Sequence, residues 1–235
     1  MGIATRLADL AGAAMLTTTE VVDVERLDEM FLLVTVASPA FGSANWTPGS
    51  KVQIRPRRGT LAFRTYTPIN WDPEQSRMSL LAYTHGDGPG AGWFRNVTPG
   101  MPLELFGPRR SLAPPSADEQ VVFVGDETSI ALACALSTTG ASIAHVVETR
   151  HPDLLLGVLD RVGLSADIVA TDPDRAALLD HVRRLAAGTP GPYRLVVTGD
   201  AATVHAVRRD ARGWTVPPHA VTGKAYWAAG RTGLD

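Results

Sequence analysis

The 235-residue sequence contains a single cysteine, Cys134. One cysteine excludes an intrachain disulfide framework, a cysteine-rich zinc site and an iron–sulfur cluster held by cysteines of this chain. No apolar run approaches the roughly 18 residues that a membrane-spanning helix requires. The first 16 residues make a poor signal peptide, because Asp9 interrupts their apolar stretch. We therefore expect a cytoplasmic protein with no membrane span.

A strong net charge and the common metal and hydrolase motifs are also missing. Lys and Arg number 22 and Asp and Glu number 24, so the formal net charge is −2. A chain this close to neutral has no overall electrostatic footprint for nucleic acid. The 6 histidines show no metal-ligand spacing, and no G-x-S-x-G motif follows a strand. We expect no protein-held metal and no serine hydrolase, and we interpret Cys134 as a packing residue.

The first half of the chain has the pattern of strands and turns. From about Thr17 to Phe106, short β-branched and apolar segments alternate with Pro, Gly and Asp. Little room is left between them for helices. This spacing predicts a six-stranded antiparallel barrel, whose strands are TTTEVVDVERLD, MFLLVTVAS, KVQIRP, LAFRTYTP, RMSLLAYTH and MPLELFG.

The second half has a different pattern. Residues 108–120 contain three prolines and no periodicity, which is typical of a linker. We place an N-terminal domain at 1–110, a linker at 111–120 and a C-terminal α/β domain at 121–235. Strands and helices then alternate, which predicts a parallel sheet covered on both faces. The predicted strands are 121–125, 141–149, 166–171 and 193–199, and the first two helices are 128–137 and 152–162.

Capping signals mark the two remaining helices of this half. Asp172 is placed as an N-cap, with Pro173 at the first helical position and Gly188 just past the end. Asp200 is expected to cap the last helix, which ends in two arginines that suit the negative end of its dipole.

The segment RTYTP at residues 64–68 is the first candidate site. Alternate side chains of a strand share a face, so Arg64 and Tyr66 point the same way. An Arg can bind phosphate through two hydrogen bonds, while a Tyr ring packs on a planar ligand. Thr65 and Thr67 add polar groups to the same segment. The alternative is an ordinary strand with a surface Arg and a half-buried Tyr.

A glycine-rich loop, HGDGPGAGW, follows at residues 85–93. It leads into a short helix, expected over Ala91–Val97, whose free amides would suit an anion. The spacing also matches G-x-G-x-x-A, but a Rossmann fold needs a full crossover helix, and Pro99-Gly100 ends this one after about two turns. The alternative is a flexible hairpin loop.

Two acidic loops follow strands of the predicted parallel sheet. Gly125, Asp126, Glu127 and Thr128 come after the first strand, and a Gly199-Asp200 pair comes after the fourth. Both would lie at the carboxyl edge of the sheet, where ligands bind. The negative charges of the first loop oppose a dinucleotide phosphate. The alternative is simple N-capping by the acidic residues.

A lysine and two aromatics lie near the end of the chain, in KAYWAAG at 224–230. Lys224, Tyr226 and Trp227 would ordinarily form a docking segment that holds the tail in place. The functional alternative is that these three side chains line a cleft.

In this order, the motifs resemble those of the siderophore-interacting protein family, FAD-dependent ferric-siderophore reductases of the ferredoxin-reductase superfamily. The resemblance extends from about Thr17 to the C-terminus. It also includes GPR at 107–109. It implies a six-stranded flavin-binding barrel followed by a nicotinamide-binding α/β domain, with FAD as cofactor and NAD(P)H as electron donor.

The resemblance also implies roles for the candidate residues. Tyr66 would stack on the flavin, Arg64 would lie near phosphate, and Thr65 and Thr67 would complete the flavin site. The loop would take the pyrophosphate through His85, Gly86, Gly88, Pro89, Gly90, Ala91, Gly92 and Trp93. The nicotinamide would be bordered by Gly125, Asp126, Glu127, Thr128, Gly199 and Asp200. The substrate entrance would hold Lys224, Tyr226 and Trp227.

The expected reaction is reduction of a ferric siderophore to release Fe(II), with electrons from NAD(P)H or a ferredoxin. Two alternatives stay open: a flavin oxidoreductase acting on an organic substrate, and a non-catalytic siderophore-binding module. The sequence departs from the family pattern at Ile69, where an Arg is common, and at Ala131, where a Pro is common. The first departure removes one candidate cation.

Overall fold

The computed structural model describes residues 16–57 and 63–231. The chain divides into two compact units, residues 1–113 and 114–235, each with its own hydrophobic core. Residues 1–15, which carry most of the segment considered as a signal peptide, lie outside the described part. None of the described helices is long and apolar enough to cross a membrane.

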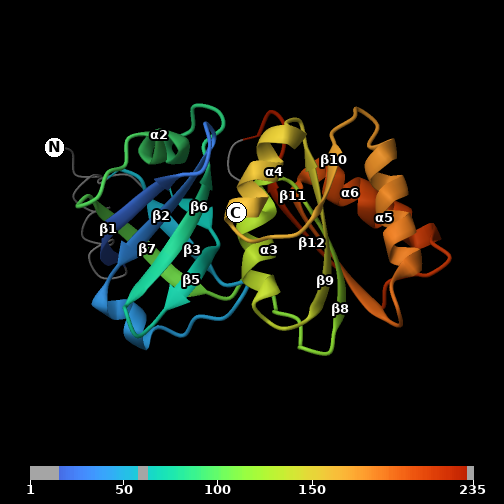
Figure 1. Ribbon diagram of the computed structural model, residues 1–235, viewed down its shortest axis with the longest axis horizontal. Helices are drawn as coiled ribbons and strands as arrows, with labels where there is room; N and C mark the ends of the chain where they lie inside the picture. The colour runs from blue at the N-terminus through green and yellow to red at the C-terminus, as the bar shows by residue number, and fades with distance from the viewer. Residues whose placement is uncertain (1–15, 58–62, 232–235) are drawn as a thin grey trace. The chain divides into compact units, whose positions relative to one another are not determined.

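The N-terminal unit is built on one antiparallel sheet of seven strands (Figure 1). Its strand order is β4-β3-β7-β1-β2-β6-β5. The strands are β1 Thr17–Arg26, β2 Phe31–Ala37, β3 Lys51–Arg55, β4 Arg64–Tyr66, β5 Pro68–Asp72, β6 Arg77–Tyr83 and β7 Pro102–Arg109, and a 3₁₀ turn, η1, spans Pro39–Ser43.

This sheet curls into a barrel-like shape that is not closed, because within the described residues its two edge strands, β4 and β5, do not pair with each other. β4 and β5 lie at opposite ends of the strand order, yet only Thr67 separates them along the chain. The two edges must therefore approach each other at Thr67. The predicted antiparallel barrel is confirmed, but the predicted number of six strands is wrong. The sheet has seven strands, because LAFRTYTP and the residues after it form two strands, β4 and β5. Pro68 has no N–H to continue the first ladder. Residues 61–62 of that segment lie outside the described residues.

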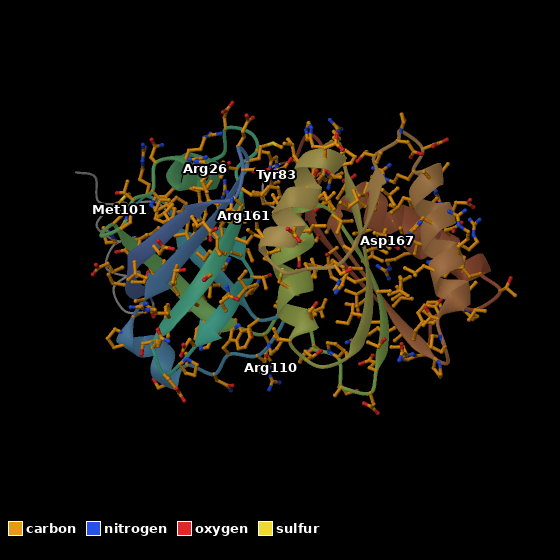
Figure 2. The ribbon with its side chains drawn as sticks, in the orientation of Figure 1. Arg26, Tyr83, Met101, Arg110, Arg161 and Asp167 are labelled. Carbon is orange, nitrogen blue, oxygen red and sulfur yellow. The ribbon has the colours of Figure 1, made fainter. Side chains whose placement is uncertain are left out.

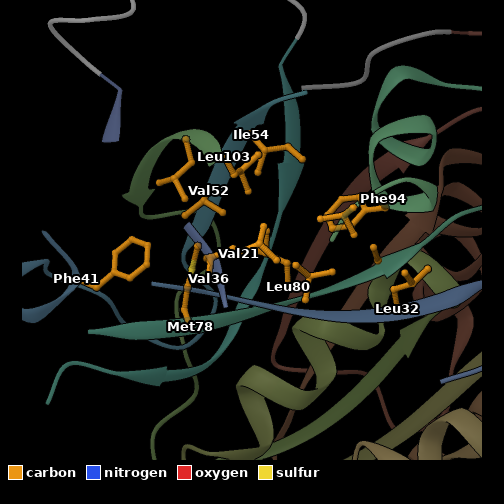
Figure 3. Packing of buried hydrophobic residues seen from close by; sticks show 14 residues of the cluster. Val21, Leu32, Val36, Phe41, Val52, Ile54, Met78, Leu80, Phe94 and Leu103 are labelled. Carbon is orange, nitrogen blue, oxygen red and sulfur yellow. The ribbon is translucent and has the colours of Figure 1, made fainter. Parts of the chain in front are cut away.

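The interior of the barrel is apolar and tightly packed (Figure 3). Inward-facing residues of β1, β2, β3, β6 and β7 meet there, as the alternation of side chains along a strand requires. Helix α2 (Pro89–Arg95) lies over one end of the sheet (Figure 1) and inserts Phe94, which is fully buried, into this core. The helix starts two residues earlier than predicted, because Pro89 suits its first position.

The C-terminal unit is a five-stranded parallel sheet with helices on both faces, as predicted. Its order is β10-β9-β8-β11-β12. Helices α5 and α6 cover one face and α3 and α4 the other (Figure 1). The elements are β8 Gln120–Gly125, η2 Glu127–Ser129, α3 Ile130–Ser137, β9 Ser142–Thr149, α4 Pro152–Arg161, β10 Asp167–Ala170, α5 Ala176–Gly188, β11 Tyr193–Asp200, α6 Ala201–Asp210, η3 Ala211–Gly213 and β12 Ala220–Trp227.

The segment around KAYW is a strand, which the sequence did not predict. β12 pairs in parallel with β11, and Lys224 lies opposite Thr198. Because β12 is at the edge of the sheet, its residues are mostly half-buried. It therefore lacks the continuous apolar run that identified β8 and β11.

The start of α5 differs from the prediction. Arg175 adopts a left-handed conformation with φ 60°, so the helix begins at Ala176 and not after Asp172. Asp172 still reaches the first turn, where its Oδ2 accepts from the amide of Ala177 at 3.1 Å. Gly188 is the last helical residue, not the one after it. The predicted cap of α6 is confirmed, since Asp200 accepts from the second amide of that helix at 3.2 Å.

Candidate functional site

Arg64 and Tyr66 converge on the first turn of α2. Both belong to β4 and pair with β3 two residues apart, so they share one face of the strand. A Cβ atom added to Gly90 would lie 2.9 Å from the Tyr66 hydroxyl and 3.2 Å from Cγ of Arg64. Glycine is needed there because any larger residue would push against both side chains. The fold thus unites two motifs that are 24 residues apart.

The Tyr66 ring is fixed by its neighbours. It packs against Phe94 of α2, with 5.1 Å between ring centroids and an angle of 61°. Burial raises the pKa of Tyr66 above its ordinary value of 10.0, and the nearby Arg64 opposes that rise. The phenol is therefore neutral at physiological pH and can donate or accept a hydrogen bond.

Glycines keep the loop before α2 open. Gly86 has φ 67°, a conformation that favours glycine. Cβ atoms added to Gly88 or Gly92 would meet nothing within 4 Å. The first-turn amides of a helix lack partners within the helix. Thr65 and Thr67 lie nearby on the β4–β5 segment and are half-buried.

Arg95, which sequence reasoning missed, holds this loop in place. From the last turn of α2, its Nη1 donates to the carbonyl of Gly86 at 2.9 Å and to that of Thr84 at 3.3 Å. Its Nη2 lies 3.5 Å from Asp87. The signal available in the sequence was a basic residue one turn beyond a glycine loop, which is too common to single out.

His85 ends a short ladder of rings. Its imidazole stacks on Tyr83, labelled in Figure 2, with centroids 4.3 Å apart, and Tyr83 stacks on the buried Phe31 at 4.9 Å. His85 itself is exposed. The start of the glycine loop is thus anchored by aromatic packing as well as by Arg95.

In the C-terminal unit, the carboxylate of Asp126 is a hub of hydrogen bonds. Its Oδ1 accepts from the amide of Thr128 at 2.9 Å and from the hydroxyl of the same residue at 2.5 Å. Its Oδ2 accepts from the amide of Asp200 at 2.8 Å and from Nε1 of Trp227 at 2.7 Å. Three motifs far apart in sequence therefore meet at one buried carboxylate. Burial raises the pKa of Asp126, and these hydrogen bonds oppose the rise.

The glycines beside this hub allow its close packing. Gly199 has φ 105°, and a Cβ there would lie 2.3–2.7 Å from the Asp126 carboxylate. A Cβ on Gly125 would lie 2.5 Å from that of Ser129. Glu127 is held as well, because its Oε1 accepts from the hydroxyl of Thr149 at 2.6 Å. Asp126 and Asp200 cap helices, as the simpler interpretation of the sequence predicted, and Asp126 also joins the ends of two strands.

A second network continues from Asp200. Arg175 donates to Asp200 Oδ2 at 2.6 Å and to the hydroxyl of Thr203 at 2.7 Å. That hydroxyl donates to Glu148 Oε2 at 2.8 Å, and burial raises the pKa of Glu148. Sequence motifs did not point to Arg175 or Glu148, because their partners lie 25 to 55 residues away.

The three residues of the C-terminal motif differ in their surroundings. Lys224 Nζ lies 6.0 Å from the ring centroid of Tyr226. Burial and the nearby Asp126 raise the pKa of Tyr226. Trp227 is 36% exposed although its indole N–H is hydrogen-bonded inside the protein. The motif therefore presents an amine and an aromatic face on edge strand β12.

Two further groups are packing residues. Burial raises the pKa of Cys134 to about 11, which leaves its thiol unreactive at neutral pH. Burial also lowers the pKa of His145 to about 4, so its ring is neutral. Within residues 16–57 and 63–231, no cluster of His, Cys, Asp and Glu could hold a metal ion.

Comparison with known proteins gives the family. A sequence model of the siderophore-interacting FAD-binding domain matches residues 20–112, and a model of the siderophore-interacting protein matches residues 118–230. The uncharacterized protein Rv2895c of Mycobacterium tuberculosis is 31% identical over 188 residues, which cover 72% of this chain and 66% of that protein. The chain thus spans slightly less than two thirds of that relative.

Solved structures share the fold. The siderophore-interacting protein SipS from Aeromonas hydrophila has a TM-score of 0.70 and 20% identity, and the match covers 93% of each chain. A ferredoxin NADP+ reductase from Neisseria gonorrhoeae, solved with bound FAD and NADP, has a TM-score of 0.68 and 13% identity over 91% of this chain and 99% of that one. The structures show the fold, and the two sequence models, which together match most of the chain, show that it belongs to the siderophore-interacting protein family and carries its FAD-binding domain.

Proposed function

We propose that the protein is an FAD-dependent ferric-siderophore reductase that takes electrons from NAD(P)H, with a ferredoxin-type protein as the alternative donor. The observation that carries the proposal is the convergence of Arg64, Tyr66 and Gly90 inside the family's FAD-binding domain. Membership of the family supports a flavin-dependent oxidoreductase, and the ferric siderophore as acceptor is the finer step that we propose.

The residues present fit the cofactor. Arg64 supplies a guanidinium that can bind phosphate, and it lies against Gly90 in the first turn of α2, where helix amides have no partner within the helix. The space in front of Gly88 and Gly92 is open, so a ligand can approach the backbone closely. The four residues from Arg64 to Thr67 are each half-buried, which leaves surface for contact.

Each of these residues has a role in the proposal. Arg64 would bind a phosphate of FAD, and Tyr66 would pack its ring against the flavin. Thr65 and Thr67 would hydrogen-bond polar groups of the cofactor. The loop from His85 to Trp93 would hold the pyrophosphate, with Arg95 keeping the loop in shape.

FAD, when bound, would supply the link between a two-electron donor and a one-electron acceptor, because a flavin can take up a hydride and release electrons singly. The chain itself contributes binding and orientation. Lys224 would attract an anionic ferric chelate through its positive charge. Reduction of the chelated Fe(III) to Fe(II) weakens binding by hard oxygen ligands, so the iron is released.

The nicotinamide site is proposed at the carboxyl edge of the parallel sheet, where ligands bind in open α/β sheets. The loop at residues 125–128 and the Gly199-Asp200 pair lie at that edge, after β8 and at the end of β11. We propose that their backbone and the exposed face of Trp227 border the nicotinamide. Their carboxylates are occupied by internal hydrogen bonds.

The first experiment is an absorbance spectrum of the purified protein, followed by anaerobic addition of NADH and of NADPH. We expect flavin bands that one or both nucleotides bleach. A colourless protein that does not take up added FAD contradicts the proposal. A yellow protein that neither nucleotide bleaches indicates a protein donor, which a reduced ferredoxin would then test.

The second experiment identifies the acceptor. The protein is reduced with dithionite and mixed with ferric siderophores in a stopped-flow instrument without oxygen. We expect the reduced flavin to be reoxidised much faster with the ferric siderophore than in buffer alone. Ferrozine should trap the Fe(II) that is released. Reoxidation no faster than in buffer points to an organic acceptor, and tight chelate binding without reoxidation points to a binding module.

A further inference from the structure

We propose that Asp126 is a positioning residue that fixes the indole of Trp227 and the Gly199-Asp200 turn in one arrangement before any ligand binds. Asp126 would act through Trp227 and would not touch the ligand itself. The kinetic consequence rests on the proposed function, but the structural consequence can be measured without it.

The Asp126 carboxylate is committed to the protein. Five donors point at it: the amide and hydroxyl of Thr128, the hydroxyl of Ser129, the amide of Asp200 and Nε1 of Trp227. Only 6% of the residue is exposed. Its negative charge is therefore compensated by internal donors. The sequence alone led us to expect that this charge repels a dinucleotide phosphate, and these hydrogen bonds reduce that repulsion.

The backbone is shaped for this contact. The pairing of β11 with β12 shifts between Gly199 and Asp200, so that Ala225 lies opposite the first and Trp227 opposite the second. Tyr226 is the extra residue, and such a bulge re-aims the side chain that follows it. Gly199 has no Cβ, which leaves the room that the Asp126 carboxylate fills. The turn, the bulge and the carboxylate thus support one another.

The result is a rigid aromatic face. Trp227 is 36% exposed, yet the one polar atom of its indole is bonded to Asp126. What remains accessible is apolar ring surface at the carboxyl edge of the sheet, where ligands bind. A fixed indole face suits a planar ring such as nicotinamide, and pre-positioning lowers the entropy lost on binding.

Asp126→Asn tests the hydrogen bond directly. The variant side chain has nearly the same shape as aspartate, but one carboxylate oxygen is replaced by an NH₂ group. This group is a hydrogen-bond donor, and it would face the N–H groups that the carboxylate accepts from. The protein has five tryptophans, and Trp227→Phe identifies which indole N–H signal in a ¹H–¹⁵N spectrum belongs to Trp227. We expect that signal to exchange with solvent about tenfold faster in Asp126→Asn, with the other four unchanged.

Asp160→Asn is the matched control, because it makes the same chemical change at an exposed position of α4. It should leave all five indole signals unaltered. The proposal is overturned if Asp126→Asn leaves the exchange of the Trp227 N–H unchanged. A general loss of protection at several indoles overturns it too, since Asp126 would then support the whole unit.

The kinetic arm uses the reduction of bound FAD by NADH or NADPH. We expect Asp126→Asn to raise the KM for the nucleotide about tenfold, with FAD content unchanged and kcat changed less. Trp227→Phe removes the indole N–H at an exposed site, so it tests the contact even if Asp126→Asn folds poorly. It should raise KM, and the double variant should be no worse than Trp227→Phe alone, because Asp126 acts through Trp227.

Additive effects of Asp126→Asn and Trp227→Phe on KM would show that Asp126 does not act through Trp227, which overturns the proposal. A protein that neither nucleotide reduces would instead count against the donor in the proposed function. In that case the exchange experiment still decides the role of Asp126, so the two failures are distinguishable.

Discussion

Arg64 and Lys224 carry positive charges that the proposed function uses differently. Arg64→Ala should weaken FAD binding by about tenfold or more, because it removes charge-assisted hydrogen bonds to phosphate. Lys224→Ala should leave FAD affinity unchanged, because we assign that residue to the chelate. Titration of the FAD-free proteins with FAD measures both. Equal FAD affinity in the two variants would contradict the assignment of Arg64.

Gly90 and Gly92 form a matched pair within α2. A Cβ at Gly90 would press on the Tyr66 hydroxyl at 2.9 Å, whereas one at Gly92 meets nothing within 4 Å. Gly90→Ala should lower the free energy of unfolding of the FAD-free protein by about 1–3 kcal/mol. Gly92→Ala should raise it by up to about 1 kcal/mol, since alanine favours helix. Urea unfolding followed by tryptophan emission separates the two, and changes of the same sign would refute the packing argument.

At the scale of elements, Arg95 connects the end of α2 with the glycine loop. Arg95→Gln removes the bonds to the carbonyls of Thr84 and Gly86 but keeps a long polar side chain. We expect FAD affinity to fall about threefold to tenfold, because the loop must then be ordered on binding. FAD titration by fluorescence quenching measures this. Arg77→Gln, at an exposed position of β6, is the control and should bind FAD like the parent.

The elements with a strong periodic signal were predicted correctly. β8 and β11 are continuous apolar runs because both of their faces are buried, and the capping role of Asp200 follows from its chemistry. The failures share a cause, since each depends on contacts made elsewhere in the fold. β12 is recognisable only through its pairing with β11, and α5 starts late because of the left-handed Arg175, whose side chain bonds Asp200 and Thr203.

Only part of the candidate site could be predicted from the sequence. RTYTP and the glycine loop were found because strand alternation and glycine chemistry act locally. Arg95, Arg175 and Glu148 were not found, because their partners come from other elements. Asp126 was identified, but its role as a hub was not, since the Trp227 indole that it binds is 101 residues away.

At the scale of the whole molecule, stability should depend on pH through His145. Its pKa is lowered to about 4 by burial, so the unfolded chain takes up a proton below about pH 6.5 while the folded chain does not. Stability should therefore fall as the pH drops from about 6.5 to 4, by up to about 3 kcal/mol. Asp126 and Glu148 have raised pKa values and act in the opposite direction.

His145→Gln isolates this contribution, because the acidic residues stay in both proteins and their effects cancel. The difference in unfolding free energy between the parent and the variant should change with pH across that window. His205→Gln, an exposed histidine on α6, should follow the parent. Chemical unfolding at several pH values makes the comparison, and parallel curves for the parent and His145→Gln would show that the buried ring does not titrate as expected.

By itself, the sequence determined the division into a barrel and a parallel α/β unit, together with the motifs that we assign to flavin binding. Periodicity, turn residues and helix caps are local, so they can be read along the chain without the fold. Only the tertiary structure decided that the strand at RTYTP breaks at Thr67 and continues at the other edge of the sheet. Likewise, only the fold brings Gly90 against Tyr66 and Asp126 against Trp227, because these contacts form between segments whose separation no local pattern encodes.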